Sequence, residues 1–236
     1  MTHTANAAED ILGDLSKTGM KLLSDSIVDG QTVRQCSCKE QDVCFAEVKT
    51  QVTRCIDSCW YRIDKLTPRP NDLRACFNDQ APFVETFLGC IGSNIHSNGQ
   101  FRCYPSEDGP QIPKQDFGRL LNLGEGNIET SRAKIMRHSA IQPIRRVVET
   151  ALEFGACVKA CFIKENECGS CFERFQCQPL VQENRAQKTL KKCVKSVNWK
   201  AKAGELCQCS LNAGVSELSE LCPMLKLMTA KTRIPR

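Results

Sequence analysis

Cysteine is the residue type in this sequence whose numbers and spacing offer the most chemistry. The chain of 236 residues contains 17 cysteines and only three histidines. Cysteine can form disulfides, ligate metals or act as a nucleophile. A content this high in an otherwise ordinary, mostly polar chain indicates a disulfide framework built in an oxidising compartment. All 17 are therefore candidates for structural disulfides: Cys36, Cys38, Cys44, Cys55, Cys59, Cys76, Cys90, Cys103, Cys157, Cys161, Cys168, Cys171, Cys177, Cys193, Cys207, Cys209 and Cys222.

The motif Cys168-Gly-Ser-Cys171 raises two alternatives to structural pairing. A zinc site would need a second C-x2-C or an H-x3-H partner at a suitable spacing, and the sequence contains neither. A thiol oxidoreductase carries its C-x-x-C where a helix opens after a strand, and the sequence around Cys168 shows no such setting. We therefore predict structural pairing, no metal site and no cofactor.

Catalytic groups other than cysteine are poorly placed for chemistry. His96 and His138 lie in loop-like or linker sequence, so no local signature supports a Cys–His pair. Carboxylates are numerous, but they are scattered along amphipathic helices, where they are usually solvated. The sequence predicts a protein that is not an enzyme and has no catalytic residues.

A C-x3-C element occurs twice, as CIDSCW at Cys55 and Cys59 and as CVKACF at Cys157 and Cys161. Apolar residues recur every three or four positions around each element, which predicts a long amphipathic helix. Two cysteines four residues apart project in parallel from one helical face, so they do not easily bond to each other. We expect each to reach a different segment, which would hold the helix to two neighbours.

The cysteines fall into two groups, from Cys36 to Cys103 and from Cys157 to Cys222, and similar spacings recur in both. Alternating strand-like patterns are nearly absent. The predicted fold is therefore all-α, with two tandem small disulfide-stapled helical modules and an N-terminal amphipathic helix. The expected boundaries are 1–35 for the N-terminal amphipathic helix, 36–110 for the first cysteine-rich helical module, 111–140 for a linker, 141–228 for the second cysteine-rich helical module and 229–236 for a basic tail. Further helices are expected at 72–91, 181–198 and 213–228.

The number of cysteines is odd, so at least one of them has no partner within the chain. If the eight cysteines of the first group closed into four bridges, one thiol of the nine in the second group would stay free or bond to another chain. We expect an intermolecular disulfide. The spacing does not identify the residue that forms it.

The net charge of +5 is unevenly distributed along the chain. Residues 1–110 hold 11 Lys and Arg against 15 Asp and Glu, whereas residues 111–236 hold 21 against 12. The second half is thus the better candidate for contact with polyanions such as sulfated glycosaminoglycan or anionic lipid. One side of the helix expected at 181–198 carries the candidate residues, for which an ordinary solvated face is the alternative: Arg185, Lys188, Lys191, Lys192 and Lys195. Nucleic acid is not expected, because few aromatic residues lie between the basic ones.

Several motifs together resemble a known family. They are CSCKEQDVC from Cys36 to Cys44, the C-x3-C helices, the spaced single cysteines and GVSELSELCP around Cys222. They look like the nematode chondroitin proteoglycan 4 family of secreted cysteine-rich helical domains, over about residues 36–103 and 144–225. The resemblance implies a non-enzymatic protein of an extracellular matrix. The sequence departs from it by lacking any Ser-Gly dipeptide for chondroitin attachment, and it also lacks an Asn-x-Ser/Thr sequon.

The sequence therefore predicts a secreted, extracellular protein that acts in matrix structure or in binding, with a protein or glycosaminoglycan partner. Residues 1–30 lack the features of a signal peptide, so we expect the signal to be absent from the given chain. No segment approaches the roughly 20 apolar residues that span a bilayer. Two alternatives stay open: a carrier with lipid or another small ligand between stapled helices, and a signalling or effector ligand.

Overall fold

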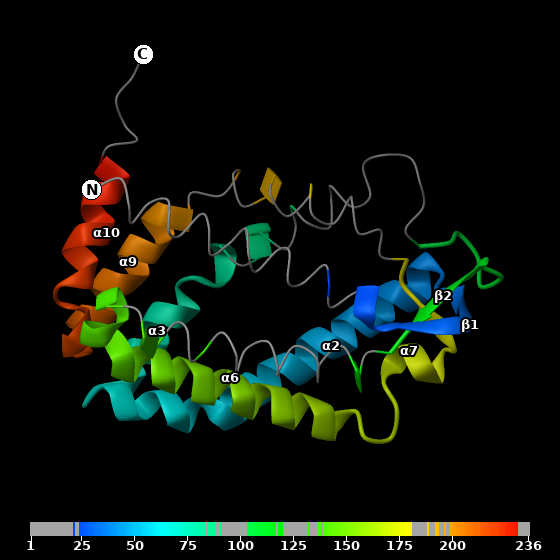
Figure 1. Ribbon diagram of the computed structural model, residues 1–236, viewed down its shortest axis with the longest axis horizontal. Coiled ribbons are helices and arrows are strands. Elements are labelled where there is room, and N and C mark those ends of the chain that lie inside the picture. Colours follow the sequence, from blue (N-terminus) through cyan, green and yellow to red (C-terminus); the bar gives the residue numbers. More distant parts are fainter. Residues whose placement is uncertain are drawn as a thin grey trace, which may run out of the picture.

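The computed structural model describes residues 21, 24–83, 85–87, 90, 103–116, 118–119, 132, 136–137, 139–180, 188, 192–193, 196 and 199–230. This part of the chain is mostly helical and includes a small mixed sheet. The sheet lies at one end of the molecule, α9 and α10 lie at the other, and α2 and α6 run side by side between them (Figure 1).

The elements follow one another in this order, with η denoting a 3-10 helix: β1 (Ile27–Gln35), α2 (Cys38–Cys59), η1 (Trp60–Leu66), α3 (Pro70–Asn78), β2 (Gln111–Gln115), η2 (Ser139–Ile144), α6 (Arg145–Glu165), α7 (Cys171–Arg174), β3 (Cys177–Gln178), α9 (Trp199–Asn212), η3 (Ser216–Leu218) and α10 (Leu221–Ala230). Both C-x3-C elements lie in long helices, α2 and α6, which confirms that prediction.

The start of α2 is fixed by a capping box. The Ser37 hydroxyl accepts a hydrogen bond from the Glu40 N–H (3.2 Å), and the Glu40 carboxylate accepts one from the Ser37 N–H (2.8 Å). These bonds satisfy backbone donors that the first helical turn leaves free. The helix then continues without interruption into η1 at Trp60.

The prediction of a purely all-α fold is wrong because residues 27–35 form a strand. β1 lies between β2 and β3, antiparallel to the first and parallel to the second. The strand is irregular: Gly30 has a φ of +69°, and the register with β2 shifts between Ile27 and Thr32. This irregularity breaks the alternation of apolar and polar residues by which a strand is recognised in a sequence. β1 occupies residues 27–35, at the end of the segment predicted as the N-terminal helix, and β2 lies within the predicted linker; the predicted boundaries themselves stay a prediction. Residues 1–20 of that helix lie outside the described part of the chain.

The predicted helix at 213–228 is interrupted at its beginning. Gly214 has a φ of +101°, and the N–H of Val215 donates to the carbonyl of Ser210 (3.0 Å), which ends α9 in a Schellman motif. Replacing Gly214 by alanine would bring the new Cβ against the Thr67 side chain. Val215 and Leu218 therefore enter the core from a turn and from η3, and α10 begins only at Leu221.

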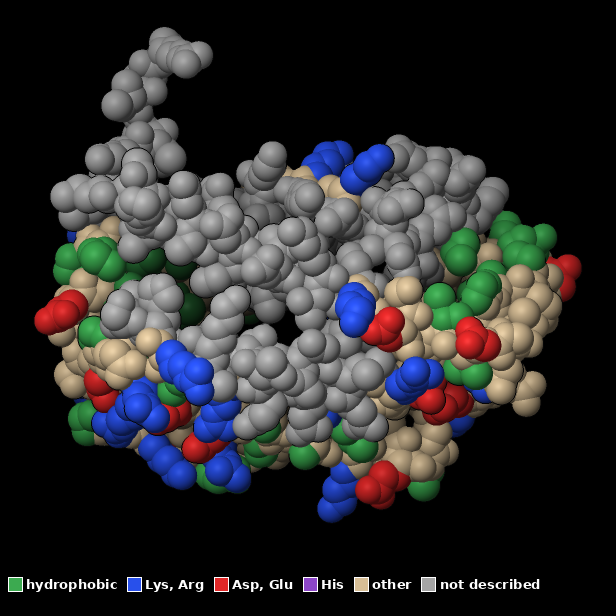
Figure 2. All heavy atoms as spheres, viewed as in Figure 1, with side chains coloured by type: hydrophobic (Ala, Val, Ile, Leu, Met, Phe, Trp, Pro, Cys, Tyr) green, Lys and Arg blue, Asp and Glu red, His purple; other side chains and the backbone are tan. Residues whose placement is uncertain are grey.

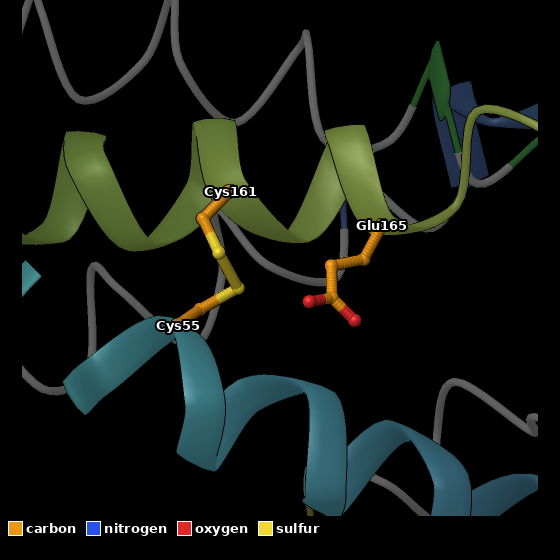
Figure 3. A group of neighbouring side chains, drawn as sticks. All are labelled: Cys55, Cys161 and Glu165. Carbon is orange, nitrogen blue, oxygen red and sulfur yellow. A yellow bond between two sulfur atoms is a disulfide. The ribbon is translucent and has the colours of Figure 1, made fainter. Parts of the chain in front are cut away.

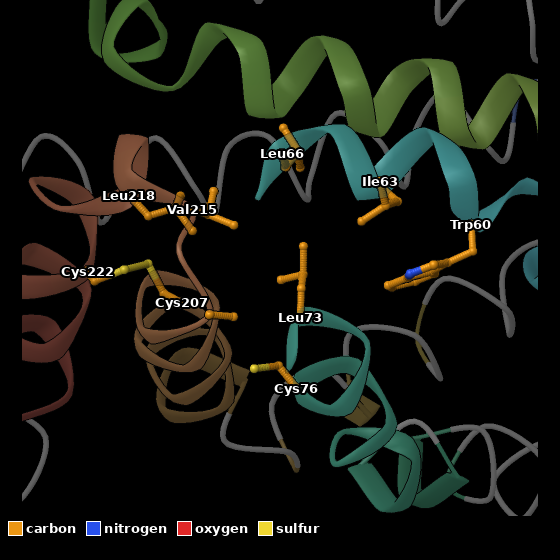
Figure 4. Close-up of a cluster of buried hydrophobic side chains, with 10 residues drawn as sticks. Trp60, Ile63, Leu66, Leu73, Cys76, Cys207, Val215, Leu218 and Cys222 are labelled. Carbon is orange, nitrogen blue, oxygen red and sulfur yellow. A yellow bond between two sulfur atoms is a disulfide. The ribbon is translucent and has the colours of Figure 1, made fainter. Parts of the chain in front are cut away.

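The largest hydrophobic core lies where η1 and α3 meet α9, η3 and α10. Trp60, Ile63 and Leu66 of η1 face Leu73 of α3, and the Cys207–Cys222 disulfide lies at the opposite side of the cluster (Figure 4). The Trp60 ring makes edge-to-face contacts with Phe77 and Phe154. Near the sheet, a second buried cluster consists of four cysteines and one aromatic residue: Cys36, Cys44, Cys171, Phe172 and Cys177. Disulfides thus supply much of the interior at that end.

Candidate functional site: the paired cysteine motifs

The two C-x3-C motifs bond to each other. Cys55 pairs with Cys161 and Cys59 pairs with Cys157, with Cα–Cα distances of 5.6 and 5.9 Å. The expectation that the two cysteines of one motif reach different segments is therefore wrong. Because α2 and α6 run antiparallel, the first cysteine of one motif faces the second cysteine of the other, and two bridges form one helical turn apart.

The other bridges connect residues between 15 and 141 positions apart in the sequence. They are Cys36–Cys177, Cys38–Cys103, Cys44–Cys171, Cys76–Cys209, Cys90–Cys193 and Cys207–Cys222. Cys38–Cys103 is the single bridge within the first cysteine group, so that group does not close on itself. Six of the eight disulfides join the first group to the second. The residue boundaries of the two modules stay a prediction, and these bridges cross between them.

Cys168 is the cysteine without a partner. Its thiol is free and exposed in the turn after α6, although the sequence favoured structural pairing for it. Its neighbour in the C-x-x-C motif, Cys171, is instead bonded to Cys44 on α2. Cys168 and Cys171 have no counterpart in the spacing of the first cysteine group, but spacing alone could not tell which of the two stays free.

Cys55, Cys161 and Glu165 are the side chains among the described residues that most resemble a metal-ligand set. Their ligand atoms lie within 4.8 Å of one another. The two sulfur atoms are joined in a disulfide, however (Figure 3). The Glu165 carboxylate forms an ion pair with Arg54 at 2.5 Å. Neutral disulfide sulfur is not the thiolate that binds metals, so the group is a structural one in the oxidised chain.

An open groove of about 630 Å³, which we call the α2–α6 groove, follows the two bridges. Half of the residues that line it are small: Cys59, Ala156, Cys157, Ala160 and Cys161. Larger or polar side chains complete the lining: Ser58, Tyr61, Arg62, Glu153 and Lys164. Both cysteines of the Cys59–Cys157 bridge line the groove, whereas the Cys55–Cys161 bridge contributes only Cys161.

The charged side chains of the groove are unevenly paired. Arg62 donates to the Tyr61 hydroxyl (2.9 Å), and its guanidinium lies 3.8 Å from the Glu153 carboxylate. Lys164 is exposed and has no ion pair in the described part of the chain. The Ser58 hydroxyl lies 3.8 Å from the Cys161 sulfur. The groove therefore places the half-buried Cys157 and Cys161 beside two cations and a single anion.

A second polar cluster ties together β1, α2 and α7. The Arg34 guanidinium donates to both carboxylate oxygens of Glu40 (2.9 and 2.7 Å) and to the carbonyl of Phe175 (3.0 Å). The hydrogen bonds from Arg34, helped by that from the Ser37 backbone, lower the pKa of Glu40 to about 2. A bidentate pair in a partly buried position fixes the orientation of the elements that carry it. Its role is structural.

The surface carries basic and acidic side chains close together. On the face seen in Figure 2, Lys and Arg side chains gather at the lower left with Asp and Glu among them. Of the predicted polyanion-binding residues, Lys188 and Lys192 are described, and both are exposed. Arg185, Lys191 and Lys195 lie outside the described residues, so this row of basic residues, which we call the basic stripe, stays a prediction.

Comparisons with known proteins give no relative. No family model matches the chain, no curated protein matches its sequence and no solved structure matches its fold. None of the helices in the described ranges is long and apolar enough to cross a membrane. The fold and its eight disulfides define a cysteine-rich, largely helical protein of the kind found in oxidising, extracellular environments.

Proposed function

We propose that this chain is a secreted, non-enzymatic scaffold that acts in extracellular matrix structure or in binding. The observation that carries the proposal is the set of six disulfides between the two cysteine groups, which join residues 98 to 141 positions apart. One closed loop of about 100 residues contributes about 4 to 5 kcal/mol by restricting the unfolded chain. Several such bridges are comparable to the whole stability of an ordinary domain, and they persist only in an oxidising compartment.

The proposal also accounts for the chemistry that the described residues offer. Buried cysteines link helices through disulfides. The group that most resembles a metal-ligand set, Cys55, Cys161 and Glu165, is a disulfide beside an ion pair. The similarity of the cysteine motifs to the nematode chondroitin proteoglycan 4 family supports a matrix role. Because the sequence has no Ser-Gly dipeptide, we propose the shared domain without its chondroitin chain.

Thiol counting on the native secreted protein tests the scaffold. We expect one reactive thiol per chain, at Cys168, or none if this exposed thiol forms the predicted intermolecular disulfide. A Cys168→Ser variant should show no free thiol, no covalent dimer on a non-reducing gel and an unchanged circular dichroism spectrum. Four or more reactive thiols in the folded native protein would refute the scaffold.

A carrier of lipid or another small ligand is the second candidate. The small apolar side chains that line the α2–α6 groove favour this function, since small-molecule sites are lined mostly by apolar groups. Native mass spectrometry of the protein purified from its source separates the two candidates. A carrier retains a bound small molecule that is lost on unfolding, whereas a scaffold has the mass of the chain alone.

A further inference from the structure

We infer that the two C-x3-C motifs together bind Zn²⁺ in the reduced chain, before their disulfides close. The ligands are four thiolates, which we call the four-cysteine site: Cys55, Cys59, Cys157 and Cys161. In this state a zinc ion joins α2 to α6 in place of the two reciprocal bridges. The inference is independent of the matrix role, which concerns the oxidised protein.

The antiparallel contact of α2 with α6 supplies the number and the type of ligands. Four thiolates are a complete donor set for a structural zinc ion. Each C-x3-C motif alone supplies only two, so neither motif indicates a metal site when the sequence is considered by itself. In the folded chain the two pairs face each other, with Cα–Cα distances of 5.6 and 5.9 Å between the helices.

The spacing of these Cα atoms fits a single tetrahedral ion. Within each helix the two cysteines are separated by about 6 Å along the axis. This is close to their separation across the helices. With Zn–S distances of about 2.3 Å, the sulfur atoms of a tetrahedral site lie about 3.8 Å apart. Side chains that project from facing surfaces and turn inward close this difference, just as two histidines four residues apart on one helix bind one zinc ion.

Potential metal ligands are concentrated at this place in the fold. The ligand atoms of Cys55, Cys161 and Glu165 lie within 4.8 Å of one another, and no other group of three in the described ranges meets this distance (Figure 3). The Glu165 carboxylate is already paired with Arg54, and the four thiolates complete the site without it. The buried cysteines near the sheet form no such group: Cys36, Cys44, Cys171 and Cys177.

The surroundings provide an entry path and compensation of charge. Three of the four cysteines line the open α2–α6 groove, so the ion can reach them from solvent. Zinc with four thiolates is a dianion, and the exposed Lys164, one helical turn from Cys161, brings a positive charge to it. The Ser58 hydroxyl lies 3.8 Å from the Cys161 sulfur, where it can donate a hydrogen bond to a thiolate.

Closure of the two bridges by a small disulfide, such as oxidised glutathione, releases the ion. For each bridge, one cysteine thiolate attacks the small disulfide, forms a mixed disulfide and expels one glutathione thiolate. The opposite cysteine thiolate then attacks the protein sulfur of the mixed disulfide and expels the second glutathione thiolate. Each small disulfide is thus reduced by two electrons as one protein bridge is oxidised. Zn²⁺ leaves because neutral disulfide sulfur does not bind it.

Differential alkylation of the full chain tests which cysteines bind zinc. The protein is reduced completely with a phosphine, freed of reductant without air, and labelled with N-ethylmaleimide in the presence of one equivalent of Zn²⁺ or of a chelator. We expect Zn²⁺ to slow labelling of the four-cysteine site about tenfold or more and to leave the other cysteines reactive. Protection of Cys168 and Cys171, of any other set, or of no cysteine would overturn the inference.

Matched double variants test the number of thiolate ligands, with Co²⁺ as a spectroscopic substitute for Zn²⁺. The reduced chain should show the absorption of tetrahedral Co²⁺ with four thiolates. Cys59→Ser, Cys157→Ser should lose that spectrum and bind Zn²⁺ about a hundredfold more weakly. Cys76→Ser, Cys209→Ser is the control, because it removes another bridge between the two groups and should keep both properties. Equal losses in the two variants would contradict a site built from the C-x3-C motifs.

Discussion

Glu40 is the residue whose contribution to the stability of the fold follows most directly from its environment. Its side chain caps α2 and accepts two hydrogen bonds from Arg34, and its pKa falls from 4.5 to about 2 in the folded chain. A carboxylate whose pKa is lowered by folding stabilises the protein above its unfolded pKa. That contribution is lost as the pH falls through the window from about 4.5 to about 2.

We therefore expect acid to destabilise the protein through Glu40 by up to about 3 kcal/mol, at about 1.4 kcal/mol per pKa unit. Denaturant unfolding with the disulfides intact, at pH 6 and at pH 2, measures the effect. Glu40→Gln should lower the stability at pH 6 and reduce its dependence on pH. Glu205→Gln is the control, since this exposed carboxylate pairs, among the described residues, with Lys202 alone on the surface of α9. Equal behaviour of the two variants would show that the Arg34–Glu40 pair is not a stabilising link.

Replacing each of two glycines by alanine should change the free energy of unfolding in opposite directions. A Cβ at Gly109 would overlap the backbone carbonyl of Gln35, whereas a Cβ at Gly155, in the interior of α6, meets nothing within 4 Å. Gly109→Ala should lower the free energy of unfolding by about 1 to 3 kcal/mol, because backbone has to move. Gly155→Ala should raise it by about 0.5 to 1 kcal/mol, because alanine favours the helix. A neutral Gly109→Ala would contradict the close packing of this loop against β1.

At the scale of elements, the two helices that carry the C-x3-C motifs were predictable, whereas α9 and the sheet were not. The recurrence of apolar residues around Cys55 and Cys157 extends over several turns, so the period of the helix is visible in the sequence. β2 has five residues and β3 has two, which is too short for an alternating pattern to stand out. Their pairing with β1 depends on contacts made by residues far away in the sequence, such as the Cys36–Cys177 bridge.

Replacing lysines by glutamate tests whether the basic stripe predicted at 181–198 binds polyanions. Changing Lys188, Lys192 and Lys195 to Glu should abolish salt-sensitive retention on heparin, because binding through charge depends on the local density of cations. The control variant has Lys39, Lys49 and Lys65, in the first half of the chain, changed to Glu, so its net charge changes by the same amount. It should keep most of its retention on heparin. Unchanged retention in the first variant would identify the stripe as a solvated face.

At the scale of the whole molecule, the sequence indicated that disulfides hold the fold but did not show which segments they join. The eight cysteines of the first group alone allow 105 pairings among themselves. Allowing cysteines of different groups to pair enlarges the number of possible pairings. The spacing of cysteines along the chain does not show which helices are neighbours in the fold. The reciprocal bridges between Cys55, Cys59, Cys157 and Cys161 follow from the antiparallel contact of α2 with α6. That contact is a property of the folded chain.

The central claim is that covalent bridges between the two cysteine groups hold the molecule together. Proteolytic mapping of the unreduced protein, with its free thiols blocked beforehand, tests this claim most directly. We expect crosslinked peptides that join the α2 motif to the α6 motif through Cys55–Cys161 and Cys59–Cys157, together with the four other bridges between the groups. Crosslinks confined within each group, with none between residues 36–103 and 157–222, would contradict it.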